Sequence, residues 1–262
     1  MVKKPGAQDE LRTRAVVGLA LICLALGALA AGGPLFWVLT SVAGVLMQGE
    51  WADLVKASDA HKRLSMFAVS VPLAILSPWA AGPSWFAWGL IAAAMIFMAI
   101  VSRSAWLAAG IAYVSLPIMA LLALRGTDAE GLLVAGWALS LVWATDIGAY
   151  FAGRAIGGPK LAPSISPSKT WAGLGGGVAC ALLVGFALHG LAGLPLVLAA
   201  ASGLLAVAAQ LGDLFESWMK RRAGVKDSGT ILPGHGGVLD RLDGVVAVAP
   251  VAALLVIWLA TR

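Results

Sequence analysis

AVVGLALICLALGALAAGGPLFWVLTSVAGVLMQ, residues 15–48, contains 34 residues without one charged side chain, and Gly32-Gly33-Pro34 interrupts it near the middle. Each half suits an apolar helix, although the second is short for a full crossing, and Gly and Pro commonly end one helix and begin the next. The stretch therefore predicts a helical hairpin in a bilayer. A basic start before an apolar run is also typical of a signal peptide, but we expect the first helix to be retained.

Apolar runs of similar length recur along the whole chain. Of its 262 residues, 60% are apolar and 12% are charged, whereas soluble domains contain about 25% charged residues. The runs are too long and continuous for barrel strands, and backbone groups in lipid must bond within their own segment. The expected fold class is all-α, a polytopic helical membrane protein with about nine transmembrane helices. The expected spans are 15–32, 34–49, 64–80, 84–101, 105–124, 131–151, 170–190, 193–212 and 238–260.

Lys and Arg are distributed unevenly between the two sides that nine spans create. With the N-terminus inside, 16 of the 18 basic residues fall on the inner side, and only Arg125 and Arg262 fall outside. Cytoplasmic loops carry the excess of Lys and Arg, so the pattern predicts a cytoplasmic N-terminus and an outer C-terminus. The net charge of +5 is interpreted as this topology signal together with affinity for anionic lipid, and no nucleic-acid partner is expected.

Two long polar segments, 152–169 and 213–237, occur late in the chain and on the same predicted cytoplasmic side. We expect N-terminal transmembrane helices over 1–130, comprising spans one to five. We expect a C-terminal catalytic membrane region over 131–262, with both polar segments. An active site in this region would face the cytoplasm.

Polar residues repeat at helical spacing near the inner end of the eighth predicted span. One helix face carries four of them, because each lies three or four residues from another member of the set: Gln210, Asp213, Glu216 and Ser217. An interfacial polar cap is the simpler interpretation. Acids inside or beside a membrane span are costly, however, and usually face a cavity with a partner, which favours a functional role.

Three further acids extend this pattern. Asp240 and Asp243 have the same three-residue offset at the start of the last span, where the helix dipole alone would also favour acids. Asp146 lies within a span, and an intramembrane acid is a functional candidate. If Asp240 and Asp243 lie close to Asp213 and Glu216, these four acids form an oxygen-rich site suited to Mg²⁺, which completes its shell with water and phosphate. The cluster therefore predicts a phosphate substrate.

Basic residues accompany the acids in the stretch 216–244. They can bind phosphate as point charges or bidentate forks, although the cytoplasmic bias alone explains some of them. These basic residues are Lys220, Arg221, Arg222, Lys226 and Arg241.

Glycines surround the only histidine of this stretch. Gly234, Gly236 and Gly237 flank His235, and glycine permits backbone conformations that bring N–H groups close to an anion. In this setting His235 is interpreted as functional.

A second polar stretch, TDIGAYFAGRAIGGPKLAPSISPSKTWAG, covers residues 145–173. Its hydroxyl residues and a lysine are expected where a new helix begins, at a terminus that can bind anions or simply be capped by one of them. These residues are Ser164, Ser166, Ser168, Lys169 and Thr170. GLGGG at 173–177 follows no predicted strand, which argues against a dinucleotide fold, and Gly173 and Gly177 indicate close helix packing.

The 27 residues from Ser217 to Asp243 resemble the signature of phosphatidate cytidylyltransferases, also called CDP-diacylglycerol synthases. The matching letters are SWMKR, then KD, then LPGHGGVLDRLD, at the family spacing and without a gap. DIGAYFAGRAIGGPKLAPSISPSKTWAG, residues 146–173, also resembles the family's second conserved block.

The resemblance implies condensation of CTP with phosphatidic acid to give CDP-diacylglycerol and pyrophosphate, for phospholipid biosynthesis. It implies dependence on Mg²⁺, with a second cation left open, and a homodimer in the cytoplasmic (inner) membrane with its site facing the cytoplasm. By matching positions, the metal-binding residues would be Asp213 and Asp240, with Asp243 joining them. Phosphate contacts would come from Lys169, Lys220, Lys226 and Arg241.

The full set of candidates combines the residue patterns with the resemblance. The catalytic candidates are Asp146, Lys169, Asp213, Glu216, Lys220, Lys226, Asp227, His235, Asp240, Arg241 and Asp243. The substrate-binding candidates are Ser166, Ser168, Lys169, Ser217, Lys220, Arg221, Lys226, His235, Gly236, Gly237 and Arg241.

Three functions other than cytidylyl transfer are alternatives. A CTP-dependent lipid-alcohol kinase would release CDP and would need an alcohol acceptor and a base, and the full late signature argues against it. A transporter of anionic solutes would have charges near the bilayer midplane and related halves, but no internal repeat is evident. A purely structural membrane protein leaves the paired acids beside a His-Gly-Gly turn unexplained.

Overall fold

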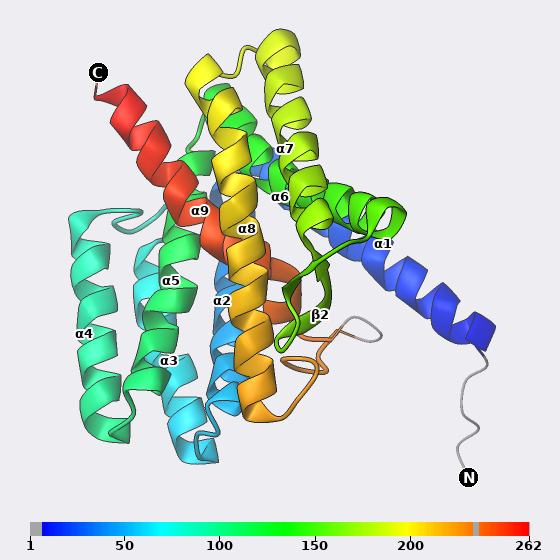
Figure 1. Cartoon of the computed structure of the whole chain (residues 1–262). Helices are drawn as coiled ribbons and strands as arrows, with labels where there is room; N and C mark the ends of the chain where they lie inside the picture. Colours follow the sequence, from blue (N-terminus) through cyan, green and yellow to red (C-terminus); the bar gives the residue numbers. More distant parts are fainter. Residues whose placement is uncertain (1–6, 233–235, 262) are drawn as a thin grey trace.

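The computed structural model describes residues 7–232 and 236–261, and most of them form long helices (Figure 1). His235 lies outside the described residues. The helices are α1 (Ala7–Ala31), α2 (Gly33–Leu54), α3 (Asp59–Ile75), α4 (Trp85–Ser102), α5 (Ala105–Arg125), α6 (Ala129–Ile156), α7 (Trp171–Ala192), α8 (Leu196–Ala223) and α9 (Leu239–Ala260). Two short antiparallel strands, β1 (Lys160–Ala162) and β2 (Ser166–Thr170), connect α6 to α7.

Six helices in the described part, α4 to α9, are long and apolar enough to cross a membrane. The expected all-α, polytopic membrane class is confirmed, with the small two-stranded sheet as the only addition among the described residues. The expected spans at 15–32, 34–49 and 64–80 correspond to α1, α2 and α3, which are not among these six. The count of nine spans and the side of the N-terminus therefore stay predictions, as does the division at residue 130.

The hairpin break predicted at Gly32-Gly33-Pro34 is confirmed. Helix α1 ends at Ala31 and α2 begins at Gly33, and Gly32 and Gly33 have φ of 62° and 47°, in the left-handed region that glycine tolerates. The buried guanidinium of Arg125 donates through Nε to the carbonyl of Leu29 at 2.6 Å and through Nη2 to that of Ala30 at 3.1 Å. It thereby satisfies carbonyl groups that the end of α1 leaves without partners.

Two clusters of buried apolar side chains hold the helices together. One joins α1, α2, α5, α6, α7, α8 and α9, and the other joins α2, α3, α4, α5, α8 and α9. Helices α8 and α9 contribute to both clusters: Leu205 and Val248 belong to the first, whereas Met219 and Val246 belong to the second. Figure 1 shows α9 crossing behind α8 between the two groups of helices. The ends of α8 and α9 are thus fixed from two sides.

Helices α6 and α7 approach each other closely through small residues. A Cβ at Gly148 would lie 2.5 Å from the carbonyl oxygen of Gly176, and one at Gly177 would lie 2.9 Å from that of Thr145. A Cβ at Gly173 would lie 3.0 Å from the carbonyl oxygen of Ala149. Gly173 and Gly177 therefore serve close packing, as the sequence indicated.

Replacing Gly148 by alanine is expected to force α6 and α7 apart and to destabilise the protein by about 1–3 kcal/mol, the usual cost of overpacking. Thermal unfolding of the purified protein in detergent measures the effect. Gly136 lies on the same helix with nothing within 4 Å of an added Cβ, so Gly136→Ala is the matched control. Equal unfolding temperatures for the two variants would contradict the packing role.

Candidate active site

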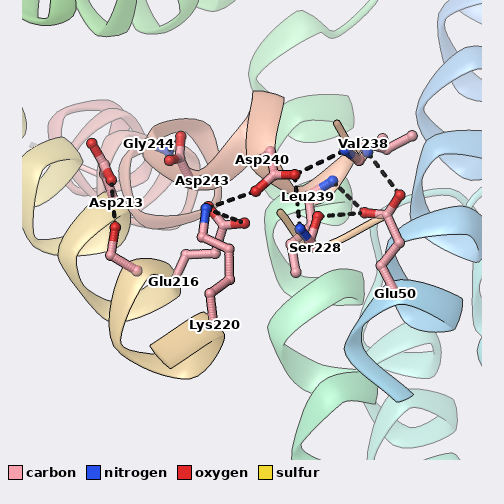
Figure 2. A network of polar contacts seen from close by, with 12 residues as sticks. Glu50, Asp213, Glu216, Lys220, Ser228, Val238, Leu239, Asp240, Asp243 and Gly244 are labelled. Atoms are coloured by element: carbon pink, nitrogen blue, oxygen red, sulfur yellow. Dashed lines mark hydrogen bonds and ion pairs between the residues drawn. The ribbon is translucent and has the colours of Figure 1, made fainter. Parts of the chain in front are cut away.

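A buried lysine joins the end of α8 to the start of α9 (Figure 2). Lys220 Nζ lies 2.7 Å from Asp240 Oδ1 and 3.4 Å from Glu216 Oε1. Glu216 is only 1% exposed, and both of its carboxylate oxygens lack a hydrogen-bond donor within the described chain. A carboxylate removed from water in this way needs a nearby cation, which Lys220 supplies only to one side.

Asp240 also holds the loop that connects the two helices. Its Oδ2 accepts hydrogen bonds from the backbone N–H groups of Ser228 at 2.9 Å and of Gly237 at 2.8 Å. The N–H of Gly237, which the sequence suggested for anion binding, therefore points to a side chain of the protein. Gly236 has φ of 81° and is paired with Leu232, so it supplies the left-handed turn that the loop requires.

Strand β2 delivers a second lysine to α8. Lys169 Nζ lies 2.5 Å from Asp213 Oδ2 and donates a hydrogen bond to Gln210 Oε1 at 3.1 Å. Ser217 donates to Asp213 Oδ1 at 3.3 Å. The shared helix face predicted for Gln210, Asp213 and Ser217 is confirmed, because they form one contiguous polar group.

The helix start expected at the end of this segment is confirmed to within one residue, but the strand that precedes it was not predicted. Ser166, Ser168 and Lys169 belong to strand β2, and α7 begins only at Trp171. Thr170 caps that helix, since its Oγ1 accepts a hydrogen bond from the N–H of Gly173 at 3.0 Å. The backbone before α7 is extended in part because of Pro167, since a proline disfavours the helical conformation of the residue that precedes it, here Ser166.

Asp146 and Asp243 complete the group of acids. Asp146 interacts electrostatically with Asp213, Lys169 and Arg241. Asp243 interacts with Asp213 and Asp146, and its Oδ1 accepts from the N–H of Gly244 at 2.7 Å. Asp240 and Asp243 thus interact with Glu216 and Asp213, as the sequence pattern suggested, whereas the approach of Asp146 to this group was not predicted. Five carboxylates, from Asp146, Asp213, Glu216, Asp240 and Asp243, thus face three cationic side chains, from Lys169, Lys220 and Arg241.

Two cavities flank this acid cluster. The first, of about 440 Å³, is partly polar and lies between α6, β2, α7 and α8, with Asp146, Arg154, Ser168, Lys169 and Asp213 in its wall. The second, of about 450 Å³, is almost entirely apolar and lies between α2, α5, α8 and α9. Its wall includes Trp51, Trp106, Ala112, Tyr113, Gly212 and Phe215. Gly212 and Asp213 are adjacent in sequence, so α8 separates a polar cavity from an apolar one.

Several candidate residues lie away from the cluster. Lys226 and Asp227 are exposed on the loop after α8. Arg221 Nε donates to the carbonyl of Ile165 at 3.4 Å, and Arg222 lies over the rings of Trp106 and Trp218 at 5.0 and 5.5 Å from their centroids. The two arginines therefore anchor the end of α8 to its neighbours, and their roles toward a substrate stay predictions.

One residue of this site was not among the sequence candidates. Glu50 of α2 is 2% exposed and accepts hydrogen bonds from Ser228, Val238 and Leu239 (Figure 2). Its signal in the sequence is an acid within the run MQGEWADL, which follows an apolar segment. Because the second span was expected to end at residue 49, Glu50 was assigned to a loop, whereas α2 continues to Leu54.

The fold and the site define a helical membrane protein in which a buried cluster of acids and lysines lies between a polar and an apolar cavity. The model of the cytidylyltransferase family matches residues 12–259. The chain belongs to this family, which confirms the resemblance drawn from the 217–243 signature.

Named relatives agree with this assignment. The chain is 40% identical to the phosphatidate cytidylyltransferase of Brucella suis over 249 residues, which cover 92% of this chain and 91% of the relative. It is 46% identical to the Bacillus subtilis protein of the same name over 130 residues, 48% of each chain. A third phosphatidate cytidylyltransferase, from Staphylococcus epidermidis, is 46% identical over 134 residues, 50% of this chain and 52% of the relative.

Lys220→Met is expected to lower the free energy of unfolding by about 3–5 kcal/mol, because it leaves two carboxylates buried beside an apolar side chain. Lys62→Met is the control: its pair with Asp53 is largely exposed, and its loss is expected to cost about 0–1 kcal/mol. Thermal and denaturant unfolding in detergent measure both. If Lys220→Met is as stable as the control, the buried pair does not hold α8 to α9.

Proposed function

We propose that this chain transfers the cytidylyl group of CTP to phosphatidic acid, giving CDP-diacylglycerol and pyrophosphate for phospholipid biosynthesis. Membership of the cytidylyltransferase family and the names of the relatives support this function. The observation that carries it is the placement of the acid cluster between a polar and an apolar cavity. A reaction that joins a nucleotide to a lipid needs both environments at the same reacting atoms.

The reaction needs charge neutralisation more than proton transfer. A phosphate oxygen of phosphatidic acid attacks the α-phosphorus of CTP, and the bond from that phosphorus to the β-phosphate oxygen breaks. Pyrophosphate leaves with the electron pair. The attacking oxygen is already ionised at neutral pH, so no general base is required. Positioning and electrostatic stabilisation dominate phosphoryl-type transfer, and Lys169, Lys220 and Arg241 are the cations closest to the cluster.

The polar cavity is the proposed nucleotide site. Arg154, Ser168 and Lys169 lie in its wall and can donate to phosphate oxygens. Arg154 is oriented by its side-chain hydrogen bond with the Tyr150 hydroxyl at 2.9 Å. Asp213 lies in the same wall, which brings the nucleotide phosphates to the edge of the acid cluster.

The acid cluster fits a magnesium ion. Five carboxyl groups lie beside three cationic side chains, and the oxygens of Glu216 are buried without a hydrogen-bond donor in the described chain. No three His, Cys, Asp or Glu side chains of the described residues converge as a complete metal cage. Magnesium rarely uses such a cage, because it keeps waters and shares substrate phosphates. When bound, it would neutralise the charge of the phosphates.

The three acids predicted as ligands differ in how well they fit. Asp213 pairs with Lys169 but lies in the wall of the polar cavity, and Asp243 accepts from one backbone N–H, whereas Asp240 already accepts from Lys220 and from two backbone N–H groups. We propose that Asp213 and Asp243 hold the ion and that Asp240 acts mainly by fixing Lys220 beside it.

The chain is a multi-pass membrane protein with several long apolar helices. We propose that it resides in the inner, cytoplasmic membrane with the acid cluster facing the cytoplasm, where CTP is available. The basic residues at the end of α8 support this orientation, since Lys220, Arg221 and Arg222 occupy its last turn. A homodimer is proposed from the family resemblance alone.

The activity is tested with purified protein in mixed micelles containing phosphatidic acid, CTP and Mg²⁺. CDP-diacylglycerol and pyrophosphate are expected in equal amounts, and Asp240→Asn is expected to lower the rate by about 100-fold or more. CDP released only after addition of a lipid alcohol would point to a kinase instead. Absence of turnover by well-folded protein with either acceptor would contradict both and favour a transporter.

The apolar cavity is the proposed position of an acyl chain of phosphatidic acid. Its wall residues on α8, Gly212 and Phe215, lie one to two turns before Lys220, and Ala247 and Pro250 lie two to three turns into α9. The cavity therefore extends from the level of the acids toward the interior of the membrane, as a lipid tail does.

Ala112→Phe, which fills this cavity, is expected to raise the KM for long-chain phosphatidic acid about tenfold, because overpacking costs about 1–3 kcal/mol. The KM for dihexanoyl phosphatidic acid and for CTP is expected to change little. Ala93→Phe, on the exposed side of α4 and outside the cavity, is the matched control. Equal effects on long- and short-chain substrates would place the lipid tail elsewhere.

A further inference from the structure

Glu50 lies on α2, a helix that contributes none of the five carboxylates of the acid cluster. It lies near the end of α2, and its carboxylate is almost fully removed from water, at 2% exposure. Acids are almost never buried to this degree without partners, because the charged form loses its hydration. What Glu50 contacts therefore indicates what it is for.

The three groups of the described chain that donate hydrogen bonds to Glu50 belong to the loop and helix start that carry the family signature. Ser228 Oγ donates to Oε2 at 3.0 Å, the N–H of Val238 to Oε1 at 2.9 Å, and the N–H of Leu239 to Oε2 at 2.7 Å. The partners are 178 to 189 residues away in sequence. Figure 2 shows the carboxylate of Glu50 directed at the start of α9.

Glu50 acts as the N-terminal cap of α9. The residue at the capping position is Val238, whose side chain offers no hydrogen bond. Helix starts leave N–H groups without partners, and the helix dipole favours a negative charge there. A carboxylate from α2 supplies both the acceptor and the charge.

Two glycines of the loop are required by this contact. A Cβ at Gly229 would lie 2.7 Å from Oε1 of Glu50, and a Cβ at Gly237 would lie 2.5 Å from Oε2. Neither glycine has a positive φ, so close approach of other side chains is the reason for glycine at both positions. At Gly229 the neighbour is the carboxylate of Glu50, and at Gly237 it is Ser228 Oγ, which is nearer, together with that carboxylate.

Asp240 holds the same loop from the opposite side. The N–H groups of Ser228 and Gly237 donate to its Oδ2, while Ser228 Oγ and the N–H of Val238 donate to Glu50. The loop is therefore clamped between two carboxylates. Loss of one clamp frees the peptide groups that orient the other, and with it the pair of Asp240 and Lys220.

We propose that Glu50 is a positioning residue for the cytidylyl transfer: it caps α9 and holds Ser228 against the start of that helix, and thereby fixes Asp240 and Lys220 in the geometry that the reaction needs. This inference rests on the proposed function for its kinetic test. Its structural test, cleavage of the loop, is independent of any activity.

Glu50→Gln keeps the shape of the side chain but presents an NH₂ group to at least one donor N–H. Removal of such an outer partner is expected to lower kcat about 10- to 100-fold, with the KM values for CTP and phosphatidic acid little changed. Glu50→Asp keeps the charge and is expected to restore part of the rate. Asp53→Asn, an acid-to-amide change one turn along α2 that removes only an exposed pair with Lys62, is the control.

Limited trypsin digestion of the full-length protein tests the clamp directly. Lys226 is an exposed cleavage site at the start of the loop, and Glu50→Gln is expected to increase its rate of cleavage, whereas Asp53→Asn leaves the rate unchanged. The positioning role would be overturned if Glu50→Gln lowered kcat without changing the rate of cleavage, and if Glu50→Asp restored none of the lost kcat. If the unsubstituted protein produces no CDP-diacylglycerol, the proposed function fails, and the cleavage comparison still decides the clamp.

A second variant keeps the inference testable if Glu50→Gln does not fold. Gly229→Ala is expected to lower kcat because its Cβ collides with the carboxylate of Glu50. In a Glu50→Ala background this collision is absent, so Gly229→Ala is expected to add no further loss, and the two effects are non-additive. Equal losses from Gly229→Ala in both backgrounds would show that the loop does not close on Glu50.

Discussion

The ion pair between Lys220 and Asp240 is the interaction on which the site depends. It joins the last turn of α8 to the first turn of α9, two helices that are otherwise mostly apolar. Lys220 Nζ lies 2.7 Å from Asp240 Oδ1. A buried pair of this kind contributes little net stability, because desolvation offsets most of the attraction, but the loss of one partner is costly. Its value lies in specificity: few arrangements of α8 and α9 leave both charges paired.

The rest of the site follows from the need to keep an excess of acid near that pair. Lys169 reaches Asp213 from β2, and Glu50 and Asp240 accept backbone N–H groups of one loop. Each of these contacts stabilises a carboxylate by hydrogen bonding or by charge without filling the space beside the cluster. The polar and apolar cavities on the two sides of α8 are therefore left for a nucleotide and a lipid.

The sequence was sufficient for the class of fold and for most of the cluster. Apolar run length predicted the helices, and spacings of three and four placed Asp213 and Ser217 on one face. Two features were not accessible. Local patterns predicted the helix start that follows Ser166 and Ser168, but gave no sign that the serines themselves form a strand, which depends on pairing with β1. Glu50 was missed because its partners lie 178 or more residues away, and a single sequence gives no sign of such a distant contact.

The cap of α9 by Glu50 also bears on the order in which the protein is assembled. A contact between residues separated by 188 or more positions forms only after the start of α9 has been made, and contacts of such high sequence separation slow folding. The first helices can insert and pack while α9 is still being synthesised, but the acids of α9 have no fixed place until it meets α2. A nascent chain that has not yet reached α9 thus lacks a completed site.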